Sequence, residues 1–526
     1  MSTSPWGEKV DRSKSALTTT TSVGDSTHTY TNDEKTAFAD WINTSLKGDP
    51  DLADLLPVNS EDDSLFKVVH NGLVMCKLIN DAVPNTIDER AINKTKLNAY
   101  RIGENQTLVL NSSRSIGCNV INISATDLME GIPHLVLGLL WQVIKIGLLS
   151  KVNLKACPEL FRLLNEGETQ ESFLKLSPDQ ILLRWVNYHL ANSGSNKRVQ
   201  NFSSDIKDSE AYTLLLNQVA PKEAGVNMSP MNESDKTKRA EKMLQEADKI
   251  KCRKFLLPRD VVNGNAKLNL AFVANLFNTY PGLEPVEEVP EEIVEETREE
   301  KTYRNWMNSM GVSPYVSHLY EGCRDGIVLL QLLDKIRPGI VDWKAVNQPP
   351  FKDRGGNMKQ IENCNYAVKL ALDSKFSLVG IEGKDIYDCN KTANLAFVWQ
   401  AMRAYTLGIL TKLSDSGSPI SDSAIIAWAN GILSSEHKIS GWKDPKITTS
   451  LPIAHLVEHL RSGTVDFSLL SSSDSYEDKV NNAKYVITCA RKVGACVFTL
   501  PEQVVESDAK MILTLFAALM TVAYKK

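Results

Sequence analysis

The sequence predicts an all-α chain built from four similar helical repeats that are arranged as two pairs. Three observations predict this fold. An amphipathic helix centred on a tryptophan occurs four times, two other helical blocks follow each copy in the same order, and an acidic segment separates the second copy from the third. Ordered self-similarity at a domain-sized interval is typical of a repeat architecture. A chain of 526 residues with 42% hydrophobic content can bury several separate cores.

The tryptophan helix opens each repeat. Its copies occupy residues 35–46, 181–190, 302–310 and 424–433. In the first copy Phe38, Ile42 and Leu46 share a stripe with the tryptophan at helical spacing. Large aromatic residues on such a stripe are usually buried. The four tryptophans are therefore expected to be structural core residues: Trp41, Trp185, Trp306 and Trp428.

Two further blocks follow in each repeat. The second block is a short leucine-rich helix, at residues 71–80, 208–217, 325–333 and 451–460. The third block joins an amphipathic helix, a turn near an acidic residue and a strongly apolar helix, at residues 104–149, 238–280, 361–405 and 479–523. The turn is marked by Asp127, Asp260 and Asp385 in the first three copies. The fourth copy is expected to keep only the helices and is the most diverged.

The segments between the blocks set the domain limits. Residues 1–30 are polar and rich in Ser and Thr, which predicts a disordered leader. Residues 151–172 contain a short apolar helix, so this connector should be packed, whereas the Glu- and Pro-rich residues 282–300 should form an exposed linker. The four repeats then span residues 31–150, 173–281, 301–408 and 421–526, with a short linker at 409–420.

Composition narrows the class of protein. A net charge of −5 without a concentrated basic stripe argues against general attraction to nucleic acid or anionic membrane. Nine cysteines without CxxC or framework spacing suit reduced thiols in a cytoplasmic protein. Residues 1–30 lack the apolar core of a secretory signal, and the apolar stretch 135–149 is shorter than the roughly 20 residues that a membrane span requires. We expect no membrane span.

Several segments together resemble a known family. The DWIN-type tryptophan helix, the NGLVMCKLIN and RDGIVLLQLL helices and the segment GIPHLVLGLLWQVIKIGLL are similar to calponin-homology domains. Four such domains in two tandem pairs, over about residues 31–525, resemble the core of the fimbrin (plastin) family. Fimbrins usually carry paired calcium-binding EF-hands ahead of the first pair, but residues 1–30 lack the D-x-D-x-D-G ligand run. The chain is thus expected to be a fragment or not to be calcium-gated through such a module.

The resemblance implies a function and a set of contact residues. Each tandem pair would bind filamentous actin, and the monomeric chain would cross-link filaments into tight bundles without a cofactor, metal or catalytic step. In this family the contact surfaces lie mainly on the first domain of each pair. The matching residues are Lys35, Asp40, Asn43, Lys47, Asp127, His134, Gln142, Lys145 and Lys151 in the first pair and Arg304, Asn308, Lys384, Lys391, Gln400 and Arg403 in the second.

One helix gives partial independent support for a contact surface. Residues 135–149 are apolar nearly all round, which a helix needs only when one side packs inside its own domain and another side is also covered. The cover is either the neighbouring repeat or a filament partner. Polar residues at the edge of such a patch are typical of an interaction surface.

Two alternatives stay open. Calponin-homology domains can also serve microtubule binding or signalling scaffolds, but two tandem pairs on one chain favour actin cross-linking. A zinc hydrolase is suggested by the H-x-x-E-H spacing of His455, Glu458 and His459. The repeat register instead buries Ile453 and Leu456 and turns the two histidines outward, and no third ligand or cleft is recognisable. We therefore expect exposed histidines and no enzyme.

Overall fold

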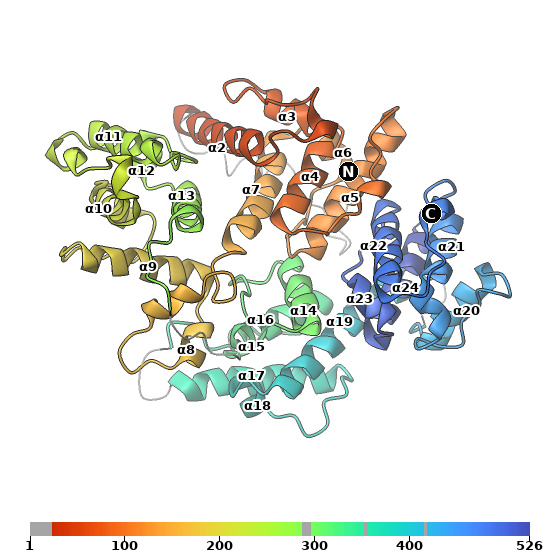
Figure 1. Cartoon of the computed structure of the whole chain (residues 1–526). Coiled ribbons are helices and arrows are strands. Elements are labelled where there is room, and N and C mark those ends of the chain that lie inside the picture. The colour runs from red at the N-terminus through yellow and green to blue at the C-terminus, as the bar shows by residue number, and fades with distance from the viewer. Residues whose placement is uncertain (1–23, 287–295, 352–355, 415–417, 526) are drawn as a thin grey trace. The chain divides into compact units, whose positions relative to one another are not determined.

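The computed structural model describes residues 24–286, 296–351, 356–414 and 418–525, in which all regular elements are helices (Figure 1). This confirms the predicted all-α class. The tryptophan helices are α2 (Gly24–Ser45), α9 (Pro178–Asn192), α14 (Arg298–Ser309) and α20 (Asp422–Ile432). The leucine-rich helices are α4 (Leu73–Ala82), α10 (Glu210–Val219), α16 (Ile327–Ile336) and α21 (Leu451–Leu460).

The third block comprises three helices in each repeat. The long amphipathic helices are α5 (Ala99–Ser115), α11 (Lys236–Lys249), α17 (Gly356–Asp373) and α22 (Tyr476–Lys492). Short helices follow as α6 (Ala125–Met129), α12 (Pro258–Asn263), α18 (Gly383–Tyr387) and α23 (Pro501–Val505). The apolar helices are α7 (Pro133–Leu149), α13 (Ala266–Thr279), α19 (Lys391–Leu413) and α24 (Ala509–Tyr524). The other α-helices are α3 (Ser64–Val68), α8 (Gln170–Leu174) and α15 (Leu319–Cys323), and short 3-10 helices lie between the α-helices.

The helices begin where local side chains satisfy their free backbone N–H groups. At the start of α9 the Ser177 hydroxyl accepts from the Gln180 N–H, and the Gln180 side chain accepts from the Ser177 N–H at 2.9 Å. Thr297 and Glu300 make the same reciprocal pair at α14. The predicted leader lies mostly outside the described residues, and its described end is helical, because α2 already begins at Gly24.

The four tryptophans do not share one environment, which corrects the expectation that all are core residues. Trp185 and Trp306 are buried, whereas Trp41 and Trp428 are half-buried. In the first repeat Phe38, one turn before Trp41, is fully buried and its ring stacks on Trp141 with centroids 6.2 Å apart. Phe38 therefore takes the core position on α2 and leaves Trp41 at the surface of its repeat.

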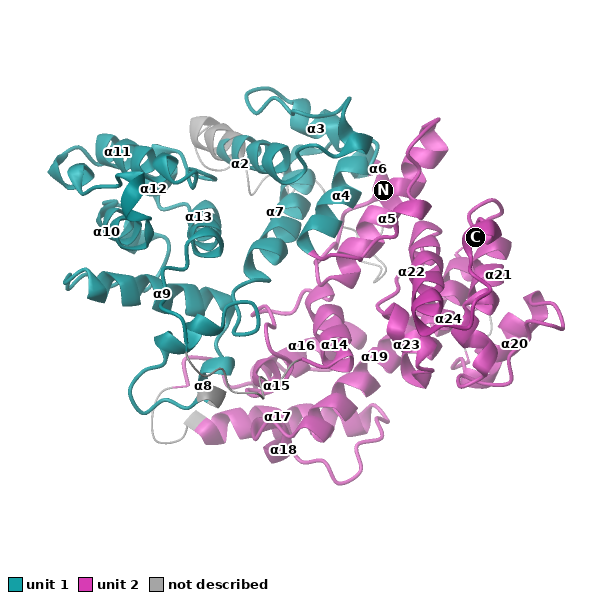
Figure 2. Cartoon of the chain, in the orientation of Figure 1, with its two compact units in different colours: residues 1–82, 127–295 teal, residues 83–126, 296–526 magenta. Residues whose placement is uncertain are grey.

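The described chain forms two compact units, each considered by itself (Figure 2). Unit 1 comprises residues 1–82 and 127–295, and unit 2 comprises residues 83–126 and 296–526. The first repeat is thus divided, because its helix α5 packs against α14 and α22 within unit 2. None of the described helices is both long and apolar enough to cross a membrane.

Candidate functional site

An asparagine two residues after each tryptophan fixes the loop that follows the helix. In the first repeat the Asn43 amide donates to the Val58 carbonyl and accepts from the Val58 N–H, both at 2.7 Å. The same pair of bonds joins Asn187 to Val199, Asn308 to Val316 and Asn430 to Ile439, at 2.8–2.9 Å. Asn43 and Asn308 were predicted to contact a filament, but the structure uses their side chains inside the fold.

The acidic residue in the turn before the apolar helix also has a structural role. The carboxylates of Asp260 and Asp385 accept from the backbone N–H groups of Leu257 and Glu382, at 2.9 and 2.8 Å. In the fourth repeat Gln503 does the same for Leu500 at 2.9 Å, so this copy keeps the short helix that the sequence analysis missed. Asp127 is buried at the equivalent place in the first repeat. This burial removes Asp127 from the exposed candidates.

The candidate residues of unit 1 divide by exposure. Asp40, Lys47, His134 and Lys151 are exposed, and Gln142 and Lys145 are half-buried. Lys35 is buried, because residues 61–63 fold over it: its ammonium donates to the Glu61 carbonyl at 3.4 Å and lies 3.5 Å from the Asp63 carboxylate. The prediction that Lys35 lies on an outer face is therefore wrong.

The second repeat covers the apolar helix α7. The Lys145 ammonium lies 3.6 Å from the Asp179 carboxylate, and the Asn278 amide donates to the Leu148 carbonyl at 2.9 Å. Helix α7 also packs against α13. The sequence left open whether the neighbouring repeat or a filament partner covers the second side of this helix. The neighbouring repeat covers the side that carries Lys145 and Leu148.

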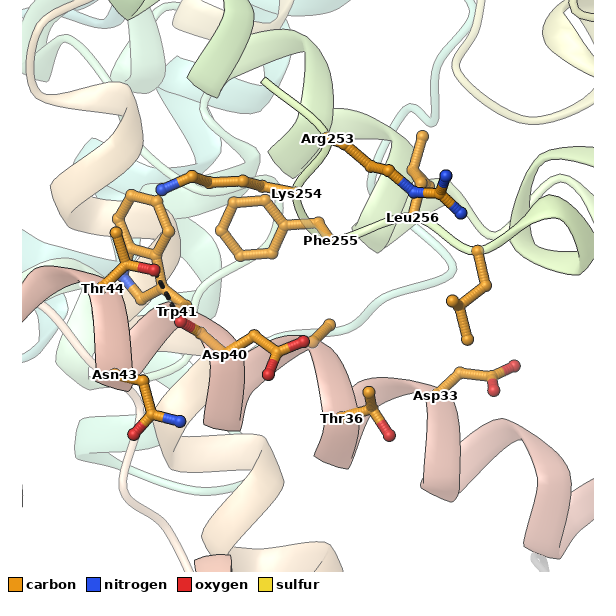
Figure 3. Close-up of a pocket in the computed structure, with 12 residues that line it drawn as sticks. Asp33, Thr36, Asp40, Trp41, Asn43, Thr44, Arg253, Lys254, Phe255 and Leu256 are labelled. Atoms are coloured by element: carbon orange, nitrogen blue, oxygen red, sulfur yellow. Dashed lines mark hydrogen bonds between the residues drawn. The ribbon is translucent and has the colours of Figure 1, made fainter. Parts of the chain in front are cut away.

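A cleft of about 410 Å³ lies between α2 and the turn at residues 253–257 in unit 1 (Figure 3). Trp41 is one of the residues that line it. The Phe255 ring packs on Trp41 with centroids 4.9 Å apart, and the Lys254 ammonium lies 5.7 Å from the centre of a Trp41 ring. Burial lowers the pKa of Lys254. Asp40 is exposed overall, but it lines the cleft, and this partial burial raises its pKa, although a Ser60 hydrogen bond opposes the shift. Trp41 thus joins two repeats.

Ion pairs flank this cleft. Asp33 pairs with Arg259, and the Glu34 carboxylate lies 3.2 Å from the Lys267 ammonium. The two acids belong to α2, and the two bases belong to α12 and α13 of the second repeat. Charge and aromatic stacking therefore hold the first tryptophan helix against the second repeat.

The candidate residues of the third repeat also separate into two groups. Lys384 and Lys391 are exposed; Lys384 pairs with Asp388 one turn later, and the Lys391 ammonium lies 6.0 Å from the Tyr320 ring centre. Arg304, Gln400 and Arg403 are half-buried. The Arg304 guanidinium bonds Glu296 at 2.6 and 3.0 Å, and Arg403 bonds Asp422 at 2.6 Å. The two lysines are thus the most accessible candidates here.

The H-x-x-E-H segment is built into the fourth repeat in another way. Ile453 and Leu456 are buried, as the repeat register predicts, and His459 is exposed. The expectation of two exposed histidines is wrong for His455, which is half-buried because its ring stacks on His437 with centroids 4.3 Å apart. The Glu458 carboxylate accepts from the N–H groups of residues 463–465 at 2.6–3.1 Å, and these bonds outweigh burial and keep its pKa below the ordinary value. The described residues contain no group of three or more His, Cys, Asp or Glu side chains that could hold a metal ion. Glu458 therefore closes a loop.

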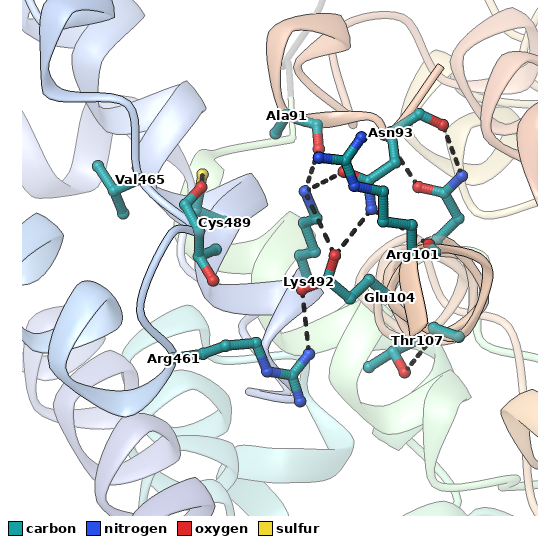
Figure 4. A network of polar contacts seen from close by, with 12 residues as sticks. Ala91, Asn93, Arg101, Glu104, Thr107, Arg461, Val465, Cys489 and Lys492 are labelled. Atoms are coloured by element: carbon teal, nitrogen blue, oxygen red, sulfur yellow. Dashed lines mark hydrogen bonds and ion pairs between the residues drawn. The ribbon is translucent and has the colours of Figure 1, made fainter. Parts of the chain in front are cut away.

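A buried polar interface joins the residue 83–126 segment to the fourth repeat within unit 2 (Figure 4). The Glu104 carboxylate lies 3.5 Å from the Arg461 guanidinium and 4.0 Å from the Lys492 ammonium. Lys492 also donates to the Ala91 carbonyl and to the Asn93 side chain, both at 2.9 Å. Burial lowers the pKa of Lys492, and Glu104 partly offsets that effect.

The adjacent Arg491 extends this interface. Its guanidinium donates to the Val497 carbonyl at 2.9 and 3.1 Å and to the Thr86 carbonyl at 2.9 Å, and burial lowers its pKa to about 10. The Asn111 amide donates back to the Arg491 carbonyl at 2.9 Å. At the C-terminal end of α5, the Asn305 amide donates to the Ser115 carbonyl at 3.0 Å. Neither the interface nor its charges were predicted from the sequence.

Comparison with protein families accounts for all four repeats. The model of the calponin homology (CH) domain matches residues 32–148, 176–282, 297–407 and 419–525. A protein named fimbrin from Dictyostelium discoideum is 58% identical over 501 residues, which are 95% of this chain and 82% of that protein. Plastin-3 of Homo sapiens is 52% identical over 508 residues, which are 94% of this chain and 80% of plastin-3.

A solved structure matches over almost the same length. The crystal structure of the actin-crosslinking core of Schizosaccharomyces pombe fimbrin superposes with a TM-score of 0.79 at 41% sequence identity. The match covers 93% of this chain and 99% of the solved chain. The helical repeats described above are therefore four calponin-homology domains in two tandem pairs.

Proposed function

Because the chain belongs to the fimbrin/plastin family of calponin-homology proteins, we propose that it binds filamentous actin through two tandem pairs and cross-links filaments into tight bundles. The observation that carries this proposal is the duplication of a whole tandem pair on one chain, over nearly the full length of an actin-crosslinking core. One pair would suffice for binding, but joining two filaments requires two binding sites. A microtubule or signalling scaffold is not favoured.

The contact surfaces are assigned to the first domain of each pair. In the first pair they include Asp40, Lys47, His134 and Lys151, and in the second pair Lys384 and Lys391. All six side chains are exposed, which a filament contact requires. The half-buried Gln142, Lys145, Arg304, Gln400 and Arg403 are assigned to the edges of these surfaces. Ion pairs with acidic residues hold Lys145, Arg304 and Arg403 in place there.

The proposed mechanism is geometric and includes no catalytic step, cofactor or metal. A chain bound to one filament presents its second pair to a neighbouring filament at a high effective concentration. Two moderate sites can then hold a bundle that neither site would hold alone. We place this action on the actin cytoskeleton of the cytoplasm.

Sedimentation with filamentous actin at two speeds tests the proposal. At high speed single filaments pellet, and the chain should pellet with them. At low speed only bundles pellet, and both actin and chain should appear there. Protein in the high-speed pellet alone would mean that only one pair binds actin. Absence of the protein from both pellets would contradict the proposal and favour the scaffold alternative.

A further inference from the structure

Three cysteines of the third calponin-homology domain converge on the segment that ends α15. Cys323 is the last residue of α15, Cys364 lies on α17, and Cys389 lies in the turn between α18 and α19. The Cys364 thiol donates to the Arg324 carbonyl at 3.2 Å, and the Cys389 thiol donates to the Glu321 carboxylate at 3.7 Å. Both acceptors lie within two residues of Cys323, so the Cys364 and Cys389 sulfurs contact the same short segment.

Helix packing brings the Cys364 and Cys389 segments together. The N–H of Gly383, the first residue of α18, donates to the Asn365 side chain at 3.1 Å. A Cβ on Gly383 would lie 2.3 Å from the Asn365 backbone nitrogen, so only glycine permits this approach. Gly383 thus holds the start of α18 against the residue that follows Cys364. Cys389 follows the other end of this five-residue helix by two residues. Burial raises the pKa of the Cys364 thiol, and Cys389 lies close enough to raise it further.

The thiols differ in access to solvent and in the groups around them. Cys323 and Cys364 are fully buried, whereas Cys389 is half-buried and can meet a solvent oxidant. Burial, followed by the nearby Asp325 and Cys389, raises the pKa of Cys364 to about 12, so it stays a protonated thiol. The Arg324 guanidinium lies 3.5 Å from Glu321 and 4.7 Å from the Tyr387 ring centre, which places a cation beside the Cys389 turn.

We propose that Cys389 and Cys364 form a redox pair that a hydroperoxide oxidises to a disulfide. The peroxide transfers one oxygen to the Cys389 sulfur, which gives a sulfenic acid and releases water from hydrogen peroxide. The Cys364 sulfur then attacks the Cys389 sulfur, the S–S bond forms, and the sulfenic hydroxyl leaves as water with the thiol proton. A dithiol returns two electrons and two protons and restores both thiols.

The disulfide has a structural consequence at the proposed filament surface. Cys389 has a φ of +57°, and its N–H donates to the Ile386 carbonyl at 3.0 Å. The next residue, Asn390, caps α19 by accepting from the Ala393 N–H at 3.1 Å. Drawing the Cys389 sulfur inward to Cys364 must therefore move the turn between α18 and α19, and with it Lys384 and Lys391. Oxidation is expected to weaken the second pair, an effect that rests on the proposed function.

Peptide mapping of the full chain tests the redox pair without reference to actin. After graded hydrogen peroxide and alkylation, a non-reducing digest should contain the Cys364 and Cys389 peptides joined, and dithiothreitol should separate them. The C389S variant should lose this species, and C364S should accumulate a dimedone-reactive sulfenic acid on Cys389. The C496S variant, which removes the exposed thiol of the fourth domain, should behave as the native chain does.

The opposite results are equally defined. The assigned pair is wrong if the oxidised chain still yields Cys364 as an alkylated free thiol. It is also wrong if Cys389 is found joined to any other cysteine. If the disulfide forms, low-speed pelleting with actin should fall several-fold while high-speed pelleting persists. Unchanged low-speed pelleting would overturn the effect on the filament surface and leave the redox pair standing. A reduced chain that pellets at neither speed would overturn the proposed function instead.

Discussion

At the scale of the residue, the asparagine after each tryptophan is the most regular feature of the four domains. Each side chain satisfies both the N–H and the carbonyl of one loop residue. A buried backbone group that loses its partner costs about 1–3 kcal/mol, so one asparagine stabilises each loop through two groups at once. The asparagine therefore fixes the path of the chain after the tryptophan helix in all four domains.

The Asn308→Ala variant tests this role in the third domain. It leaves the N–H and carbonyl of Val316 buried without their partner and should destabilise the domain by roughly 2–4 kcal/mol. Hydrogen exchange at the Val316 amide should accelerate by more than tenfold. Asn308→Asp separates the two bonds, because its carboxylate still accepts from the Val316 N–H but cannot donate to the Val316 carbonyl, and it should retain only part of the protection. Unchanged exchange in Asn308→Ala would refute the assignment.

The residue scale is also where the sequence was least informative. The spacing W-x-N is visible in all four copies, but the partner residue lies 15, 12, 8 or 9 positions downstream. A loop of variable length hides the partner, so Asn43 and Asn308 looked like polar surface residues. The prediction that Lys35 lies on an outer face failed for the same reason, because the loop that covers Lys35 follows no periodic pattern.

At the scale of the element, the connector between the first two domains is packed against the second domain. Leu160 of the connector is fully buried. The Glu168 carboxylate accepts from the Arg184 guanidinium of α9 at 2.5 and 3.0 Å. These hydrogen bonds and the Asn165 N–H lower the pKa of Glu168 from 4.5 to about 2. The apolar pattern of the connector predicted that it packs. The ion pair could not be predicted in the same way, because its two residues lie 16 positions apart and meet only in the folded chain.

The pair between Glu168 and Arg184 predicts a pH dependence. Because folding lowers the pKa of Glu168, its stabilising effect is complete above about pH 4.5 and is lost as the pH falls toward about 2. The Arg184→Met variant should therefore be less stable than the native chain near neutral pH, and the difference should shrink below pH 4.5. Urea unfolding followed at several pH values measures this trend. A difference that stays constant through this range would contradict the pairing.

Helices α18 and α19 present the exposed lysines of the second pair. The double variant Lys384→Glu/Lys391→Glu reverses two charges at the proposed contact and should lower low-speed pelleting with actin at least tenfold. High-speed pelleting should persist through the first pair. Lys438→Glu/Lys443→Glu in the fourth domain makes the same charge change at exposed positions and serves as the matched control. Equal loss in both variants would attribute the effect to net charge.

At the scale of the whole molecule, helix α5 of the first domain is packed within unit 2. Four repeats and their order could be predicted, because helical periodicity and the recurring tryptophan are local signals. The packing of α5 on α14 and α22 could not, because the buried polar residues of α5 resemble a solvated helix face in the sequence. Glu104, Asn111, Arg491 and Lys492 are each at most 7% exposed. These side chains can be buried without a large cost only when α5 and α22 pack together, because each then has a polar partner on the other helix or in the segment beside it.

The Glu104→Ala variant tests this interface. It leaves the Lys492 ammonium buried without a nearby carboxylate, which typically costs about 3–5 kcal/mol. Hydrogen exchange should rise in both α5 and α22. The paired variant Glu104→Leu/Lys492→Met removes both charges and should recover most of the protection, since a buried ion pair and an apolar pair are often equivalent. Protection unchanged in Glu104→Ala would show that the interface does not depend on this pair.

Two-colour filament capture tests the claim of two actin sites on one chain most directly. Actin filaments of one colour are fixed to a surface, saturated with the chain and washed, and filaments of a second colour are then added. The second filaments should be captured alongside the first, because each bound chain still presents a free pair. Chain that stays on the fixed filaments while the second colour washes away would contradict the account.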